Sequence, residues 1–470
     1  MGQEIANIHF PPEAWNAFAT RLTQETDLLC QALASGHFTT DAYVGGFELE
    51  AWLVDRNYFP APDNEAYLAH LNHPLVVPEL SKFNVELNGT PQALQGDALS
   101  RMEQELTQTW RHCLVKAHDL GNSLIMVGIL PTVREADLCL ANISPLNRYY
   151  ALNAEVLKRR GGAPIRVTIE GADRLQLTHA DVMLEAATTS FQVHLQVPVE
   201  EAVRYYNTSL IVSAPLVAAS ANSPYLFDHA LWEETRIPLF EQAVDMGNGP
   251  ARVTFGTGYL QNSIAECFEE NLTDYDVLLP VQFDEAPARF NHLRLHNGTI
   301  WRWNRPLIGF DEAGKPHVRI EHRVMPAGPS ILDQIANAAF YFGVARFLAG
   351  LGQAPEADLP FATARDNFYQ AARLGLDAEV TWLDGQRVKL HALILDELLP
   401  MARQGLRWLG IDETESTRYL DVIRARVKGR QTGAAWQRAY TDRHGRDFFR
   451  LTAAYLENQR SGAPVHEWDI

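Results

Sequence analysis

The clearest pattern of hydrophobic and polar positions in the chain is a strict alternation over short runs. Residues 45–55, GGFELEAWLVD, set Phe47 and Leu49 against Glu48 and Glu50, because side chains along a strand point alternately to its two faces. Two carboxylates on one face of an otherwise apolar strand repel each other and lose hydration. The pattern therefore predicts a strand whose polar face needs a counter-charge.

Three further segments show the same alternation. Their polar positions are Asn84, Glu86 and Asn88 in residues 82–91, Gln192, His194 and Gln196 in residues 190–197, and Arg319, Glu321 and Arg323 in residues 316–324. Any one of these runs is typical of an antiparallel strand with one face in water. The polar positions named for these four runs contain no lysine and concentrate carboxylate, imidazole and guanidinium groups. Such groups bind hard divalent cations and phosphate, so we predict a site for Mg²⁺ or Mn²⁺ on one face of a sheet.

The remaining pattern is mainly helical. Residues 11–35 and 96–121 have the period of amphipathic helices, and helical patterns dominate from Asp333 onward. Strands that occur in scattered pairs between helices are typical of an α+β protein with a mostly antiparallel sheet. The stretch 350–360, GLGQAPEADLP, is the best candidate linker. We therefore expect a catalytic core over residues 1–350 and a helical C-terminal region over residues 351–470 that packs on it.

Composition narrows the class of protein. A chain of 470 residues with 46% hydrophobic residues has enough apolar material for a sizeable core. Its net charge of −18 disfavours nucleic acid or an anionic membrane as a partner. The four cysteines form no CxxC pair, and the longest apolar stretch, residues 210–221, is shorter than the roughly 20 residues that span a bilayer. With no signal-peptide pattern at the start, we expect a cytoplasmic protein that acts on small molecules.

Motifs that usually hold phosphate or a catalytic serine are missing from the sequence. It contains no GxxxxGK[ST] loop, no GxGxxG after a strand and no GxSxG elbow. Phosphate would then be held by metal ions and arginines, for which Arg323, Arg148, Arg236, Arg302 and Arg305 are candidates. An arginine with its head group in water is the ordinary alternative for each. Hydrolase chemistry with two carboxylates stays open on residue types alone.

Six motifs in order over residues 40–345 resemble the glutamate-cysteine ligase family, in its plant-type and bacterial carboxylate-amine ligase branch. They are GGFELE, VELNGTP, SFQVHLQ, SANSPY, TIWRWNRP and RIEHRVMPAGPS. The resemblance implies a glutamine synthetase-like fold, in which a curved, mainly antiparallel sheet lines the active site and helices pack on its outer face. It also implies an ATP- and Mg²⁺-dependent ligase that forms a γ-glutamyl amide through an acyl phosphate, with L-glutamate as donor and L-cysteine as the expected acceptor.

The resemblance further implies roles for individual residues. It makes Arg323 and Arg236 catalytic, Arg323 and Arg305 contacts of the nucleotide, and Arg148, Arg236 and Asn222 parts of the substrate pocket. The expected metal ligands are Glu48, Glu50, Glu86, His194 and Glu321. The run VMPAGPS after RIEHR and residues 163–187 depart from the family pattern. The alternatives are therefore a different amine acceptor, a non-catalytic nucleotide-binding descendant and a metal-dependent hydrolase.

Overall fold

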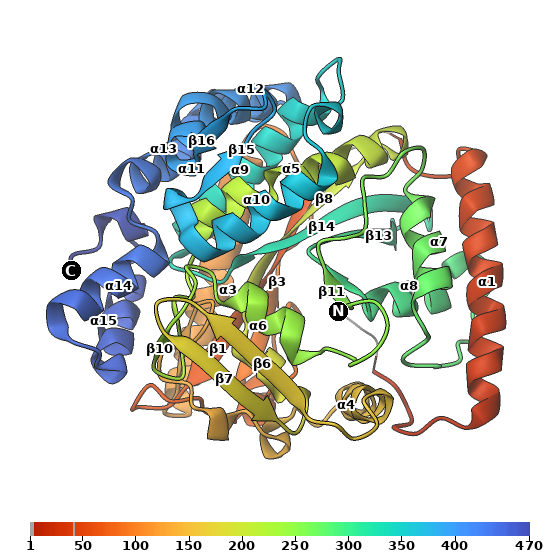
Figure 1. The fold of residues 1–470 in the computed structure, drawn as a ribbon, viewed down its shortest axis with the longest axis horizontal. Helices are drawn as coiled ribbons and strands as arrows, with labels where there is room; N and C mark the ends of the chain where they lie inside the picture. Colours follow the sequence, from red (N-terminus) through yellow and green to blue (C-terminus); the bar gives the residue numbers. More distant parts are fainter. Residues whose placement is uncertain (1–3, 41–42) are drawn as a thin grey trace.

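A curved antiparallel sheet forms the centre of the protein. The structure, a computed structural model, describes residues 4–40 and 43–470. Within this part the central sheet has the strand order β13-β14-β8-β1-β3-β2, with the short β4 and β5 paired to β1 (Figure 1). The strands are β1 (Val44–Val54), β2 (Val76–Pro78), β3 (Asn84–Asn88), β4 (Gln92–Ala93), β5 (Ser123–Ile125), β8 (Ser190–Val197), β13 (Asn304–Phe310) and β14 (Pro316–Pro326). All their pairings are antiparallel, as predicted.

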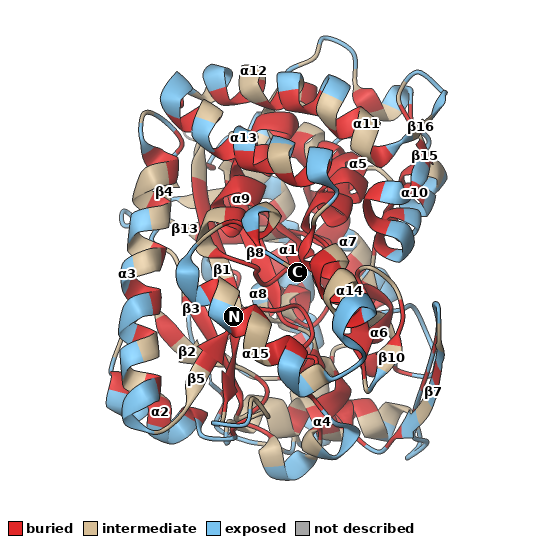
Figure 2. Cartoon of the chain, turned by 90° about the vertical axis from the view of Figure 1, so that its left-hand side faces the viewer, coloured by how far each residue is buried: buried red, intermediate tan, exposed pale blue. Residues whose placement is uncertain are grey.

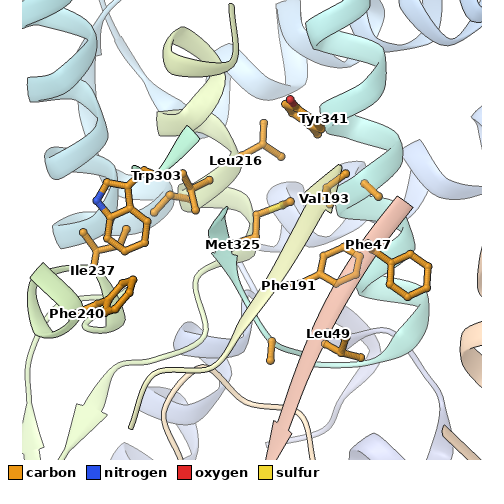
Figure 3. Close-up of a cluster of buried hydrophobic side chains, with 14 of the residues drawn as sticks. Phe47, Leu49, Phe191, Val193, Leu216, Ile237, Phe240, Trp303, Met325 and Tyr341 are labelled. Carbon is orange, nitrogen blue, oxygen red and sulfur yellow. The ribbon is translucent and has the colours of Figure 1, made fainter. Parts of the chain in front are cut away.

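The apolar face of this sheet is covered by two long helices, α5 (Ala202–Ser220) and α9 (Ile331–Ala349). Phe47 of β1 and Phe191 of β8 point to the side on which Leu216 of α5 and Tyr341 of α9 lie (Figure 3). The longest apolar stretch of the sequence thus serves as the buried helix α5. Across the described residues, no helix combines the length and apolarity needed to cross a membrane.

The capping of α9 shows how the sequence sets the position of a helix. Ser330 accepts a hydrogen bond from the amide of Asp333, whose carboxylate accepts one from the amide of Ser330, and together they form a capping box. The other carboxylate oxygen of Asp333 forms a buried ion pair of 2.7 Å with Arg426 of α13 (Glu413–Gly429). The same aspartate therefore starts α9 and attaches a C-terminal helix to it.

Other helices surround this centre, and Figure 2 shows that α3 and α12 keep exposed outer surfaces while the sheet is buried. The predicted helices at residues 11–35 and 96–121 are confirmed as α1 (Pro12–Ala34) and α3 (Ala98–Asp119). The others before the C-terminal region are α2 (Asn64–Leu71), α4 (Asn147–Arg159), α6 (Arg236–Ala243), α7 (Ala265–Asp274) and α8 (Asn291–Gly298). Residues 163–187, which no sequence pattern placed, form the hairpin β6 (Ile165–Glu170) and β7 (Arg174–His179) followed by the 3₁₀ helix η3 (Val182–Ala187). Two further short pairs are β9 (Tyr225–Leu226) with β10 (His229–Ala230) and β11 (Val253–Thr254) with β12 (Trp301–Arg302).

The C-terminal region is mainly helical, as predicted, and packs on α5 and α9. Its helices are α10 (Phe361–Leu374), α11 (Leu390–Leu393), α12 (Leu399–Leu409), α13, α14 (Gly433–His444) and α15 (Phe448–Ser461). Two elements were not predicted: α14, and the hairpin β15 (Glu379–Thr381) with β16 (Arg387–Lys389). The division into a core and a C-terminal region at residue 350 stays a prediction.

Candidate active site

A first group of metal-binding side chains lies on the polar face of three adjacent strands. Glu321 of β14 is directly opposite His194 of β8 in the strand register. His194 Nε2 is 3.2 Å from Glu48 Oε1 on β1 and 3.9 Å from Glu321 Oε1. We call these residues the Glu48–His194–Glu321 cluster. One potential ligand atom from each residue lies within 4.8 Å of the others, which places three of the five predicted metal ligands together.

A second group lies on the same sheet, one residue pair further along β1. Glu50 is directly opposite Glu86 of β3, and Glu79 follows the short strand β2. Their nearest carboxylate oxygens also lie within 4.8 Å of one another. We call this the Glu50–Glu79–Glu86 cluster. Glu79 was missed by the sequence analysis, because it stands after a three-residue strand with no alternating pattern, and only its position beside β3 could have indicated it.

Arginines neutralise the first cluster. Arg305 is opposite Glu321 in the register of β13 and β14, and its Nε and Nη2 donate to the two carboxylate oxygens at 2.7 and 3.1 Å. Arg323 Nη1 is 3.3 Å from the same carboxylate, and Arg319 Nε donates to His194 Nδ1 at 3.1 Å. Burial by itself would raise the pKa of Glu321, but the charges of Arg305 and Arg323 hold that pKa well below its usual range.

Glu48 in the first cluster also stays charged. Burial would raise its pKa, but the neighbouring imidazole of His194, whose Nε2 lies 3.2 Å from Glu48 Oε1, lowers the pKa of Glu48 to about 2. Its Oε2 is buried and has no hydrogen-bond partner among residues 4–40 and 43–470. A buried carboxylate oxygen without a partner is costly, so this atom fits the coordination of a cation.

In the second cluster, burial and the neighbouring carboxylates outweigh the charge of Arg323, which lowers the pKa of Glu50. Burial, and to a smaller extent the charge of Glu86, raise the pKa of Glu50 to about 7. Burial and the charge of Glu50 also raise the pKa of Glu79 to about 7. Burial and the charge of Glu48 raise the pKa of Glu86 well above its ordinary value. Glu50 is supported by neutral donors, the amide of Ser190 at 2.7 Å and Gln192 Nε2 at 2.9 Å. The cluster therefore holds carboxyl groups whose repulsion these contacts do not relieve.

Glu185 brings a further acidic group toward this second cluster. It lies on η3, in the segment that departs from the family pattern. Burial and then the charge of Glu50 raise the pKa of Glu185 to about 8, while the charge of Arg323 lowers it. Sequence analysis missed Glu185, since a single glutamate on a short 3₁₀ helix carries no periodic signal.

Both clusters suit divalent cations chemically. Glutamate oxygens with at most one imidazole are ligands that Mg²⁺ and Mn²⁺ accept, and Mg²⁺ coordinates them at about 2.1 Å. Ligand atoms within 4.8 Å of one another can surround one such ion. The sheet therefore presents two candidate cation sites side by side, each with one ligand from β1.

A cavity of about 380 Å³ opens beside the first cluster. Glu48, Glu321, Arg305 and Arg319 line its sheet side. Its helix side is mainly apolar, with Arg148 and Arg294 as charged members; it includes Leu152, Phe268, Leu279, Phe283 and Leu295. A charged wall facing an apolar wall fits a ligand that has an anionic end and a flat apolar end.

Three of the predicted site residues lie in different surroundings. Arg148 lines the cavity and donates to the hydroxyl of Tyr149 at 2.9 Å. Arg236 is buried, where it pairs with Glu234 at 3.2 Å and donates to the carbonyls of Arg323 and Val324. The side chain of Asn222 donates to the carbonyl of Ala327 and to the hydroxyl of Tyr455, among residues that support the end of β14. Neither Arg236 nor Asn222 lines the cavity, so their contact with substrate stays a prediction.

The curved antiparallel sheet, with helices packed on its apolar face, has the glutamine synthetase-like fold. The chain belongs to glutamate-cysteine ligase family 2, whose sequence profile matches residues 44–453. The family resemblance and the fold class predicted from the motifs are thereby confirmed. The family and the fold are those of ligases that join a carboxylate to an amine.

Solved structures agree with this fold at low sequence identity. The chain is similar to a glutamate–cysteine ligase from Francisella tularensis in complex with AMP, with 13% identity, 90% of each chain covered and a TM-score of 0.61. It is also similar to a bifunctional glutathione synthetase from Pasteurella multocida, with 12% identity and a TM-score of 0.54, over 92% of this chain and 55% of that one. A search of curated protein sequences gives no significant match.

Proposed function

We propose that the protein is an ATP- and Mg²⁺-dependent ligase that joins the side-chain carboxylate of L-glutamate to an amine, with L-cysteine as the first acceptor to test. The observation that carries the proposal is the pair of acidic clusters on one sheet face beside a cavity with a charged wall and an apolar wall. The family to which the chain belongs supports glutamate and cysteine as substrates. The cytoplasm is the proposed compartment.

We assign the residues of the site separate roles in binding ATP and in stabilising the transferred phosphoryl group. The triphosphate of ATP would lie along the wall with Arg305 and Arg319, and its base on the apolar helix side. Divalent cations held by the two clusters would neutralise the carboxylates and the phosphate charge. Arg323, fixed by Glu321 and Gln192, would stabilise the charge that develops on the transferred phosphoryl group.

The chemistry then needs no nucleophile from the protein. The side-chain carboxylate of glutamate attacks the terminal phosphorus of ATP, ADP leaves, and an acyl phosphate forms. The nitrogen of the acceptor amine attacks the acyl carbon, inorganic phosphate leaves, and the amine loses a proton. The protein contributes positioning and electrostatic stabilisation, consistent with four cysteines that form no reactive motif.

The identity of the amine acceptor stays open because one segment of the chain departs from the family pattern. Residues 163–187 depart from the family pattern, and they end in η3, which brings Glu185 toward Glu50 and Arg323. A carboxyl group at this place would ionise beside a positively charged group, and it would therefore favour an acceptor that carries one. A ligase of the same family with another amine substrate is therefore the second candidate function.

The test is an assay of the purified protein with ATP, Mg²⁺ and glutamate, with cysteine or with each of a panel of other amines. Phosphate release and mass spectrometry of the γ-glutamyl product are measured, with Glu321→Gln as the inactive control. Product with cysteine supports the first candidate, and product only with another amine supports the second. Phosphate release from ATP without glutamate would favour a hydrolase, and nucleotide binding without turnover would favour the non-catalytic alternative.

A further inference from the structure

The N-terminal segment, residues 4–34, lies outside the part of the chain that matches the family profile, which begins at residue 44. It nevertheless reaches the cavity beside the first cluster, because Ile5 is one of the lining residues. Its helix α1 packs against α7 and α8, two helices that also contribute to the cavity wall (Figure 1). The segment therefore lies outside the matched family region and touches the candidate nucleotide pocket directly.

Ile5 is held in place by contacts on both sides. Asn147, at the start of α4, donates from Nδ2 to the carbonyl of Ile5 at 2.9 Å, and its amide donates to the carboxylate of Glu4 at 2.6 Å. The side chain of Ile5 is 5% exposed and packs with Ala151 and Leu279. The neighbour of Asn147 is Arg148, which lines the same cavity. The wall around Ile5 is thus fixed by packing and hydrogen bonds.

A second contact joins α1 to the cavity through a buried pair. Glu25 of α1 and His292 of α8 are each 1% exposed, and Glu25 Oε1 is 2.8 Å from His292 Nδ1. The other oxygen of Glu25 accepts from the amide of Leu293 at 3.0 Å. The amide of Phe283 donates to His292 Nε2 at 3.4 Å. Because Nε2 accepts this bond, Nδ1 carries the proton and donates to Glu25.

This arrangement positions one ring of the cavity wall. The ring of Phe283 meets the imidazole of His292 edge to face, with centroids 5.1 Å apart, and Phe18 of α1 contacts the same imidazole at 5.1 Å. Phe283 lines the cavity, as does Leu295, one turn further along α8 from His292. A substitution of Glu25 would therefore alter the position of His292, and through it the position of Phe283 in the cavity wall.

We infer that residues 4–34 form part of the binding subsite for the nucleotide base, in which Ile5 closes the apolar side and Glu25 acts through His292 as a positioning residue for Phe283. This inference rests on the proposed ATP-dependent function. It implies that the base is selected partly by a segment outside the residues that match the family profile. An apolar wall with few polar groups favours a flat, uncharged heteroaromatic base over the charged phosphates.

The experiment uses the full-length protein and measures the Kd of ATP by calorimetry, together with KM for ATP and for glutamate. Ile5→Trp should fill the subsite and raise the Kd and KM of ATP about tenfold or more, while KM for glutamate stays within about twofold. Ile5→Ala should give a smaller change in the same direction. The matched control is Ile8→Ala, since Ile8 packs in the same apolar cluster but does not line the cavity.

Glu25 is tested in the same assay. Glu25→Ala should raise the Kd of ATP several-fold, and Glu25→Asp, which keeps the acceptor for His292, should recover part of the affinity. Unchanged ATP affinity in Ile5→Trp would overturn the inference, as would equal increases in KM for both substrates. If the unmodified protein binds ATP but forms no amide, the proposed function fails and the inference stands. If the amide forms and the variants behave as the parent, the inference fails alone.

Discussion

The two acidic clusters of the central sheet both include residues of β1, but the pKa values of their buried carboxyl groups are shifted in opposite directions. The Glu48–His194–Glu321 cluster is surrounded by Arg305, Arg319 and Arg323, and the pKa values of its two carboxylates are lowered. The Glu50–Glu79–Glu86 cluster is supported mainly by neutral donors, and the pKa values of its three carboxyl groups are raised. Arginines of the protein compensate the first cluster, whereas we propose that a cation from solution compensates the second.

This difference gives the clusters different expected roles. Arginines that already pair with Glu321 can share their charge with phosphate when a nucleotide binds, so the first cluster suits phosphate recognition. In the second cluster, the proposed cation would reduce the mutual repulsion of the three carboxyl groups. We therefore propose that the sheet separates a phosphate-recognition side from a cation-dependent side along β1.

The largest effect, on kcat, is expected from removing one of the arginine charges that compensate the carboxylates of the first cluster. Arg323→Gln should lower kcat about 100-fold or more, because one donor to the transferred phosphoryl group is lost. Glu321 keeps its bidentate pair with Arg305, so the fold should remain intact. Phosphate release and far-UV circular dichroism measure the two quantities. Arg365→Gln, an exposed change on α10, is the control, and a folded Arg323→Gln variant with parental kcat would contradict the assignment.

The cation dependence of the second cluster is tested by ligand-induced stabilisation. Mg²⁺ with a non-hydrolysable ATP analogue at about 100 times Kd should raise the free energy of unfolding by about 2.7 kcal/mol. Glu86→Gln should remove much of this gain because it deletes one anionic ligand, whereas Glu312→Gln, an exposed change, should leave it intact. Thermal melts with and without the pair give the measurement. An undiminished gain in Glu86→Gln would show that the cluster does not hold the cation.

The smallest expected effect is a pH dependence of opposite sign at the two clusters, measured by denaturant unfolding with chelator present. The folded pKa of Glu79, about 7, lies above its ordinary value of 4.5. Its cost to stability is therefore absent below about pH 4.5, grows as pH rises and is complete above pH 7. Glu79→Gln should be more stable than the parent by about 2 kcal/mol at pH 8 and equal to it near pH 4.5.

Glu48 should behave in the reverse way. Its folded pKa, about 2, lies below the ordinary 4.5, so its stabilisation is present above about pH 4.5 and is lost as pH falls toward 2. Glu48→Gln should be less stable than the parent throughout pH 5 to 8, with little change across that range. Two variants that shift stability in the same direction at pH 8 would refute the contrast between the clusters.

Much of the sheet could be predicted because its information is local. Alternation in β1, β8 and β14 assigned Glu48, His194 and Glu321 to one side and Phe47, Phe191 and Val193 to the other, and Figure 3 shows the latter three among the buried apolar residues. The segment that forms η3 was different, since nothing in its sequence indicated that Glu185 would approach Glu50. Helix α14 was missed because its short run carries mixed polar and apolar residues without a strong period.

The sequence by itself determined the α+β class and which faces of the strands are polar, since side-chain direction follows from a two-residue period. It also identified five of the six residues in the two clusters, all except Glu79, because these five lie on strands with an alternating pattern. Only the tertiary structure decided that these residues separate into two clusters, that Glu79 completes the second, and that Arg305 pairs with Glu321. The reason is physical: strand order, register and burial bring together residues far apart in the chain, and the pKa of a carboxyl group depends on those neighbours.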